Sequence, residues 1–328
     1  MKKSILILIA AMLMAGILSA CGSAGTAGSA DTDRISIVTT ILPEYDWVMN
    51  ILGSNPAGAE VTMLLDNGVD LHSYQPTAED IMKVSTCDLF IYVGGESDEW
   101  VEDALKEATN KDMVVINLLD VLGDQVKEEE VVEGMQEEEE EHEGWEEDGP
   151  EYDEHVWLSL RNAAVLTDSI SKAVQKIDGK NAAVYKDNSD AYIAKLNELD
   201  KRYEDTVSNA SVKTLLFGDR FPFRYLVDDY GLSYYAAFVG CSAETEASFE
   251  TITFLAGKVD EMSLHAVMTI EGNDHRIAET IIQNTTTKDQ QILTMDSMQS
   301  TTAKDVENGT TYLGVMENDL AVLAEALK

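Results

Sequence analysis

Two histidine-centred segments carry the side chains of this chain that are best suited to chemistry. The first is Asp70-Leu-His72-Ser-Tyr, and the second is Tyr152-Asp-Glu-His155-Val-Trp. A neutral imidazole nitrogen is a common ligand of transition metals, and a neighbouring carboxylate orients the ring. Either histidine alone is more typical of a solvated surface residue. Together with a suitable carboxylate, they raise the hypothesis of a metal site.

The places of these residues along the chain favour that hypothesis. His72 lies in a loop beyond the predicted strand Val61–Leu65, and Asp296 directly follows the predicted strand Gln291–Met295. In open α/β sheets, ligands bind outside the carboxyl ends of the strands. Asp296 could instead cap a helix together with Ser297, which is the simpler interpretation of that residue taken alone.

Strands that alternate with helices must position these side chains. Runs of β-branched and apolar residues predict strands, and amphipathic segments between them predict helices. The predicted strands are Ile35–Thr40, Val61–Leu65, Asp88–Val93, Val114–Leu118, Lys213–Phe217, Tyr234–Val239, Ala266–Ile270 and Gln291–Met295. This alternation predicts an α/β fold with parallel sheets, in an N-terminal lobe over 35–178 and a C-terminal lobe over 211–328.

A single long helix separates the two lobes in the sequence. Apolar residues recur at three- and four-residue steps between Asn181 and Ala210, and this segment contains neither proline nor glycine. Such a pattern is typical of an amphipathic helix. We therefore predict a rigid linker helix over 179–210.

The segment before His155 is strongly acidic. From Glu128 to Glu154, 16 of 27 residues are Asp or Glu, and none is Lys or Arg. We expect a mobile acidic loop over 124–154, because so much like charge opposes packing. The loop could collect cations weakly, although His142 is its only internal histidine, or it could serve only to keep the protein soluble.

Composition limits the functions that are open to the chain. Its 328 residues favour two domains, and its net charge of −38 argues against nucleic-acid binding, which needs basic side chains. The sequence contains no His-Glu-x-x-His, Gly-x-Ser-x-Gly or Walker-type glycine loop, so nothing points to an enzyme. Cys87 and Cys241 fall in different lobes, and we expect two buried single thiols rather than a disulfide.

The N-terminus has the features of an export signal. Lys2-Lys3 precedes an apolar stretch over Ile5–Leu18, and Leu18-Ser-Ala-Cys21 resembles a bacterial lipobox. We predict a lipoprotein signal peptide over 1–20, a lipid on Cys21 and a flexible tether over 21–34. The mature chain would then be anchored on the extracytoplasmic face of the cell membrane.

Motifs spread over the whole mature chain match one known family. They are Ile35–Thr40, Asp70–Asp80, Tyr152–Leu158, Tyr230–Leu232 and Tyr312 with Met316 and Asn318. Together they resemble the zinc- and manganese-binding lipoproteins of bacterial ABC importers. The resemblance implies two Rossmann-like lobes joined by a long helix, with the metal held between the lobes.

The resemblance also implies a set of metal ligands. His72, His155 and Asp296 match three positions of the family site. The remaining position, a His or Glu in the family, falls in Gly218-Asp-Arg220. A gapless match places Arg220 there, which cannot coordinate a metal, whereas a slip of one residue places Asp219 there. We favour Asp219, with Glu271 and His142 as alternatives.

The acid-rich insertion before His155 favours Zn²⁺ over Mn²⁺, because zinc-binding members of the family often carry a charged, His-rich loop there and manganese-binding members lack it. Here the loop is Glu-rich and contains only His142. The resemblance implies two partners, an ABC permease and its ATPase, for a receptor that works as a monomer. Two alternatives remain open from the sequence. One is a manganese receptor of the same type, and the other is a surface adhesion or interaction protein with a degenerate metal site.

Overall fold

The computed structural model describes residues 34–136, 151–242, 246–272 and 274–328. The predicted signal peptide 1–20, the lipid-attachment residue Cys21, nearly all of the tether and the candidate ligand His142 lie outside the described residues. The chain from Ile35 to Lys328 forms one compact unit. Within the described ranges, none of the helices combines the length and the apolar content that crossing a membrane requires.

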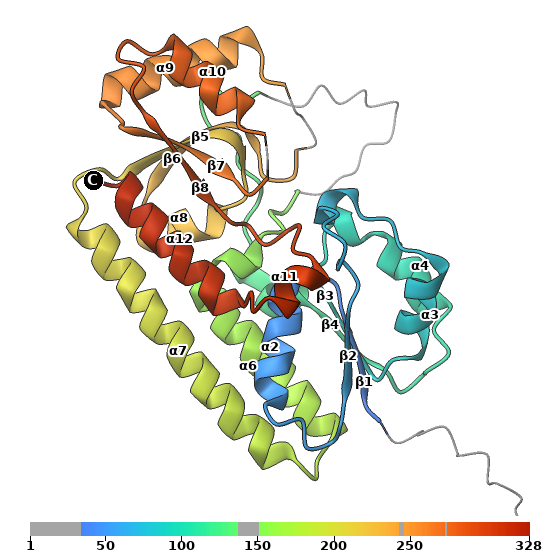
Figure 1. Cartoon of the computed structure of the whole chain (residues 1–328). Helices are drawn as coiled ribbons and strands as arrows, with labels where there is room; N and C mark the ends of the chain where they lie inside the picture. The colour runs from blue at the N-terminus through green and yellow to red at the C-terminus, as the bar shows by residue number, and fades with distance from the viewer. Residues whose placement is uncertain (1–33, 137–150, 243–245, 273) are drawn as a thin grey trace, which may run out of the picture. The chain divides into compact units, whose positions relative to one another are not determined.

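A four-stranded parallel sheet organises the N-terminal lobe (Figure 1). Its strands are β1 (Ser36–Thr39), β2 (Glu60–Met63), β3 (Leu89–Tyr92) and β4 (Val114–Asn117), in the order β2-β1-β3-β4. The helices are α2 (Leu42–Leu52), α3 (Ala78–Thr86), α4 (Trp100–Lys106), α5 (Leu118–Leu122) and α6 (Leu160–Ile177). Consecutive strand residues are buried, such as Ile37 and Val38 in β1 and Phe90 and Ile91 in β3. This is expected where helices cover both faces of a parallel sheet.

The C-terminal lobe repeats this arrangement. Its strands are β5 (Thr214–Phe221), β6 (Ser233–Val239), β7 (Ala266–Ile270) and β8 (Gln291–Met295), all parallel and in the order β6-β5-β7-β8. The helices are α8 (Arg224–Tyr230), α9 (Phe249–Met262), α10 (Arg276–Asn284), α11 (Ala303–Glu307) and α12 (Tyr312–Ala326). The predicted α/β class with two Rossmann-like lobes is confirmed, and both sheets use the same strand order.

Helix α7 (Ala182–Asn209) is the long helix predicted between the lobes. At 1.5 Å of rise per residue, its 28 residues span about 42 Å. Its buried residues form one stripe, and it packs against α6, α2 and α12. The Tyr192 hydroxyl donates to Asp46 on α2, and the Tyr203 hydroxyl donates to the Met316 carbonyl on α12. The helix therefore contacts elements of both lobes and acts as a rigid connection.

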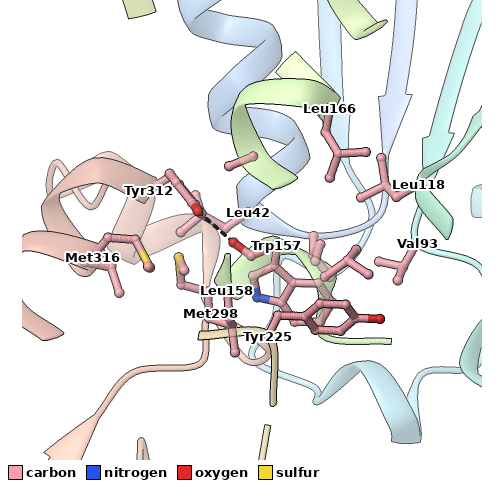
Figure 2. Packing of buried hydrophobic residues seen from close by; sticks show 14 of the residues in the cluster. Leu42, Val93, Leu118, Trp157, Leu158, Leu166, Tyr225, Met298, Tyr312 and Met316 are labelled. Carbon is pink, nitrogen blue, oxygen red and sulfur yellow. Dashed lines mark hydrogen bonds between the residues drawn. The ribbon is translucent and has the colours of Figure 1, made fainter. Parts of the chain in front are cut away.

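One hydrophobic cluster extends through both lobes and surrounds Trp157 (Figure 2). The indole is fully buried, and its Nε1–H donates to the Ser297 carbonyl at 2.8 Å. The Tyr312 hydroxyl donates to the Trp157 carbonyl at 2.6 Å. Leu42 of the N-terminal lobe and Tyr225 of the C-terminal lobe belong to the same cluster. Trp157 thus ties both lobes to the segment that carries His155.

The acidic run differs from the expectation that it would not pack. Its described ends lie against the protein: Glu128 and Tyr152 form an antiparallel bridge, and the Gln136 amide donates to the Ala237 carbonyl. Glu130 lies 3.2 Å from the guanidinium of Arg224. The expectation was wrong for these ends, because backbone hydrogen bonds and a basic side chain of the C-terminal lobe compensate the acids.

The predicted state of the cysteines is confirmed, with one difference. Cys87 and Cys241 are both free thiols, as expected. Cys87 is fully buried in the N-terminal core, whereas Cys241 is partly exposed. The expectation of two buried thiols therefore holds for Cys87 and only in part for Cys241.

A buried carboxyl group beneath α7 predicts how stability changes with pH. Burial raises the pKa of Asp46 to about 6, although the Tyr192 hydroxyl opposes that rise. A raised folded-state pKa contributes stability at low pH, and this contribution is lost as pH rises through 6. We expect Asp46→Asn to gain about 1–2 kcal/mol relative to wild type between about pH 5 and pH 8, measured by urea unfolding. Asp205→Asn, at an exposed position of α7, is the control, and parallel profiles for all three proteins would contradict the prediction.

Candidate metal centre

His72 sits on a short 3-10 turn, Leu71–Ser73, in the loop that follows β2. Asp70 begins this turn by accepting a hydrogen bond from the His72 amide, and the fully buried Leu71 fixes it to the core. The Nδ1 atom of His72 lies 2.7 Å from the Ser97 hydroxyl, which belongs to the loop after β3. The ring is thus held by the carboxyl-end loops of β2 and β3, the two strands that flank β1 in the sheet.

His155 is fully buried and precedes a 3-10 turn over Val156–Leu158. The Asp153 carboxylate accepts from the His155 amide at 2.9 Å and lies 3.0 Å from its Nδ1. Because an ionised carboxylate can only accept, Nδ1 carries the proton. The opposite nitrogen, Nε2, is therefore left with a lone pair, which is the form that binds a metal.

The two imidazoles face each other through their Nε2 atoms, which Ser97 and Asp153 do not contact. The Nε2 atoms of His72 and His155 are 3.2 Å apart, and the ring centroids are 5.2 Å apart. Two nitrogens bound at about 2.0–2.1 Å to one tetrahedral zinc would lie about 3.3 Å apart. A proton can bridge the pair in the metal-free protein. The spacing is also that of a two-histidine chelate.

The environment gives the two rings different proton affinities. Burial, with the neighbouring His155 and Arg220, lowers the pKa of His72 to about 3, although Asp70 opposes the shift. Burial also opposes a charge on His155, but the Asp153 charge and hydrogen bond, with Glu154, outweigh burial and raise the pKa of His155. His72 is therefore neutral at physiological pH, and His155 is the ring at which protons compete with a metal.

The segment Gly218-Asp-Arg220 lies within strand β5, which continues past the predicted end at Phe217 to Phe221. The Arg220 guanidinium donates to the carboxylate of Asp70, two residues from His72. The Asp219 carboxylate accepts from the Ile270 amide at 3.2 Å, on the neighbouring strand β7. The register of β5 is irregular between Phe217 and Arg220, so these contacts, rather than simple alternation along the strand, assign the faces. Arg220 is thus the residue that faces the histidines, and Asp219 is engaged elsewhere.

Asp296 and Glu271 lie together at the ends of β8 and β7. The Asp296 carboxylate accepts from the Met298 amide, and Glu271 accepts from the amide and hydroxyl of Ser297. Burial raises the pKa of Asp296, and burial with the Asp296 charge raises the pKa of Glu271. Both line a cavity of about 570 Å³ whose other lining residues are Gly272, Ser300, Thr301, Asp305 and Thr310.

In the part of the chain that the structure describes, one group of possible metal ligands gathers around the histidine pair. Donor atoms of His72, His155 and Cys241 all lie within 4.8 Å of one another. The structure thus brings together His72 and His155 of the predicted set, and it does not place Asp219 or Asp296 in the same group. Our sequence reasoning missed Cys241, although its position after the predicted strand Tyr234–Val239 was a signal of the same kind as that of Asp296.

Comparison with known proteins gives consistent matches. The family described as zinc-uptake complex component A, periplasmic, matches residues 37–326. The high-affinity zinc uptake system protein ZnuA of Bacillus subtilis is 30% identical over 332 residues, which cover 99% of this chain and 98% of that protein. The zinc-binding lipoprotein AdcA of Streptococcus pneumoniae is also 30% identical, over 326 residues, but this chain spans only 61% of its length.

Solved structures agree with these matches. The Zn(II)-bound ZnuA-like domain of Streptococcus pneumoniae AdcA has a TM-score of 0.69 and 26% identity, over 90% of this chain and 99% of that one. The metal-dependent lipoprotein YcdH of Bacillus subtilis has a TM-score of 0.71 and 25% identity, with the same coverage of both chains. The family matches nearly all of the unit that carries the facing histidines, and this chain belongs to the zinc-uptake complex component A family.

Proposed function

We propose that this chain is the extracytoplasmic receptor of a zinc ABC importer. It captures Zn²⁺ between its two lobes and delivers the ion to a membrane permease that a separate ATPase powers. The observation that carries the proposal is the pair of imidazoles, one fully buried and one partly buried, whose Nε2 atoms face each other at 3.2 Å. The zinc-binding relatives support zinc as the cargo over manganese, and support transport over adhesion.

In this proposal, His72 and His155 are the nitrogen ligands, and Asp153 and Ser97 orient their rings. Asp296 remains a candidate carboxylate ligand. It starts the loop that contains Gln299, whose side chain interacts with His72. Both carboxylate oxygens of Asp219 accept from backbone amides, those of Arg220 and Ile270, whereas the Met298 amide engages only Oδ1 of Asp296. Asp296 is therefore the better placed of the two predicted carboxylates.

We further propose that the mature chain is a monomer anchored by a lipid on Cys21 and that it catalyses no reaction. The Leu18-Ser-Ala-Cys21 motif supports the anchor, as does the description of the Streptococcus pneumoniae relative as a lipoprotein. Membership of an uptake family supports a receptor rather than an enzyme.

The first test removes each imidazole in turn. We expect wild type to bind one Zn²⁺ per chain in titration calorimetry. His72→Ala and His155→Ala should each weaken binding by more than about 100-fold, the upper range for loss of a residue that only orients a ligand. His265→Ala is the control, because His265 instead contacts the Glu325 carbonyl and should leave zinc affinity unchanged. If wild type bound no zinc, or if neither histidine mattered, the proposed function would be wrong.

The second test concerns the carboxylate that fixes the His155 tautomer. Asp153→Asn should weaken zinc binding by about 10–100-fold, because Nδ1 loses its anionic acceptor. The pH below which zinc affinity begins to decline should also fall, because the Asp153 charge raises the pKa of His155. Zinc titrations between about pH 5 and pH 8 measure both effects, because free imidazole titrates within that range.

Glu151→Gln is the matched control for this test. Glu151 is an exposed acid of the same segment, whereas Asp153 is buried and contacts His155. Equal affinity and equal pH profiles for Asp153→Asn and wild type would show that the carboxylate does not position the ring.

A further inference from the structure

We propose that the thiolate of Cys241 is a zinc ligand contributed by the C-terminal lobe. This inference rests on the proposed function and adds a sulfur donor to it. The sulfur and the nearest imidazole nitrogens of His72 and His155 all lie within 4.8 Å of one another. Around one tetrahedral zinc, nitrogen and sulfur donors lie about 3.3–3.6 Å apart, so shifts of about 1 Å bring the three into contact with the ion.

The backbone before Cys241 brings the thiol to this place. Gly240 follows the end of β6, and a Cβ atom on it would lie 2.8 Å from Cε1 of His155 and 3.0 Å from the Phe221 carbonyl. A side chain at position 240 would therefore push the turn away from the ring. The Cys241 amide donates to the Glu129 carboxylate at 3.3 Å, so the described start of the acidic run also holds the turn.

Unpartnered buried oxygens beside the same group give an independent sign of a missing cation. Glu154 Oε2 has no hydrogen-bond partner, its side chain is 3% exposed, and it lies 3.6 Å from Nδ1 of His72. Burial and this carboxylate raise the pKa of the Cys241 thiol in the metal-free protein, so the proposed thiolate forms only together with a bound cation. Gln299, whose side chain interacts with His72, also has a buried Oε1 without a partner. Such groups are costly to bury unless a positive charge or a donor satisfies them.

The Cys241 thiolate would replace the metal ligand that Arg220 cannot provide. Arg220 occupies the β5 position that faces the histidines, and a guanidinium cannot bind a metal. A further protein ligand then has to come from elsewhere, and Cys241 lies in the turn after β6, the strand next to β5 in the sheet. On binding, the S–H bond of Cys241 breaks, a Zn–S bond forms and the proton passes to solvent. The resulting set of two imidazoles and one thiolate suits zinc better than manganese.

The test loads the full chain with Co²⁺ in place of zinc and records its absorption spectrum. We expect a thiolate-to-cobalt charge-transfer band in wild type that disappears in Cys241→Ser. Cys241→Ser should also bind Zn²⁺ at least about 100-fold more weakly, more than the loss of a group that only orients a ligand. Cys241→His should recover zinc affinity without the band. Cys87→Ser and Cys21→Ser are the matched controls and should keep both the band and the affinity.

The outcomes separate this inference from the function on which it rests. If wild type binds zinc through His72 and His155 but shows no such band, or if Cys241→Ser binds zinc as wild type does, the Cys241 assignment is overturned. Asp296→Ala and Asp219→Ala then identify the carboxylate that takes its place. If wild type binds neither ion, the proposed function and the Cys241 assignment both fail.

Discussion

The burial of Trp157 is the interaction on which the rest of the site depends. Its indole fills the centre of a cluster shared by both lobes, and its Nε1–H and its carbonyl are hydrogen-bonded to Ser297 and Tyr312. Burying a tryptophan removes a large apolar surface from water, which stabilises the fold. Hydrogen bonds to its polar atoms offset the cost of burying them. Because His155 lies two residues before Trp157, the same contacts fix the His155 imidazole where the lobes meet.

The site combines imidazole ligands with buried carboxyl groups. Behind the histidine pair, the carboxyl groups of Glu154, Asp98 and Glu44 interact in series. Burial raises the pKa of all three, that of Asp98 to about 7. Arg220 and Asp70 form an ion pair beside the rings. A divalent cation bound at the pair would be stabilised by these carboxyl groups, whose ionised forms are unfavourable without it.

Much of this architecture could be predicted from the sequence. Hydrophobic periodicity is a local property, so it located the strands of both parallel sheets and the long helix α7. Lipobox and histidine motifs pointed to an exported metal receptor before any contact was known. The charge density of the acidic run was a less reliable guide to its structure. Its described start contacts Arg224 and the Ala237 carbonyl, which lie far away in the sequence.

The sequence by itself determined the α/β class, the two lobes and the pairing of His72 with His155 as candidate ligands. Only the tertiary structure decided which residue of Gly218-Asp-Arg220 faces them and that Cys241 lies beside them. The physical reason is that a one-residue change of register reverses the face of every side chain in a strand. The approach of β6 to His155 likewise depends on how two sheets pack, which no local pattern along the chain records.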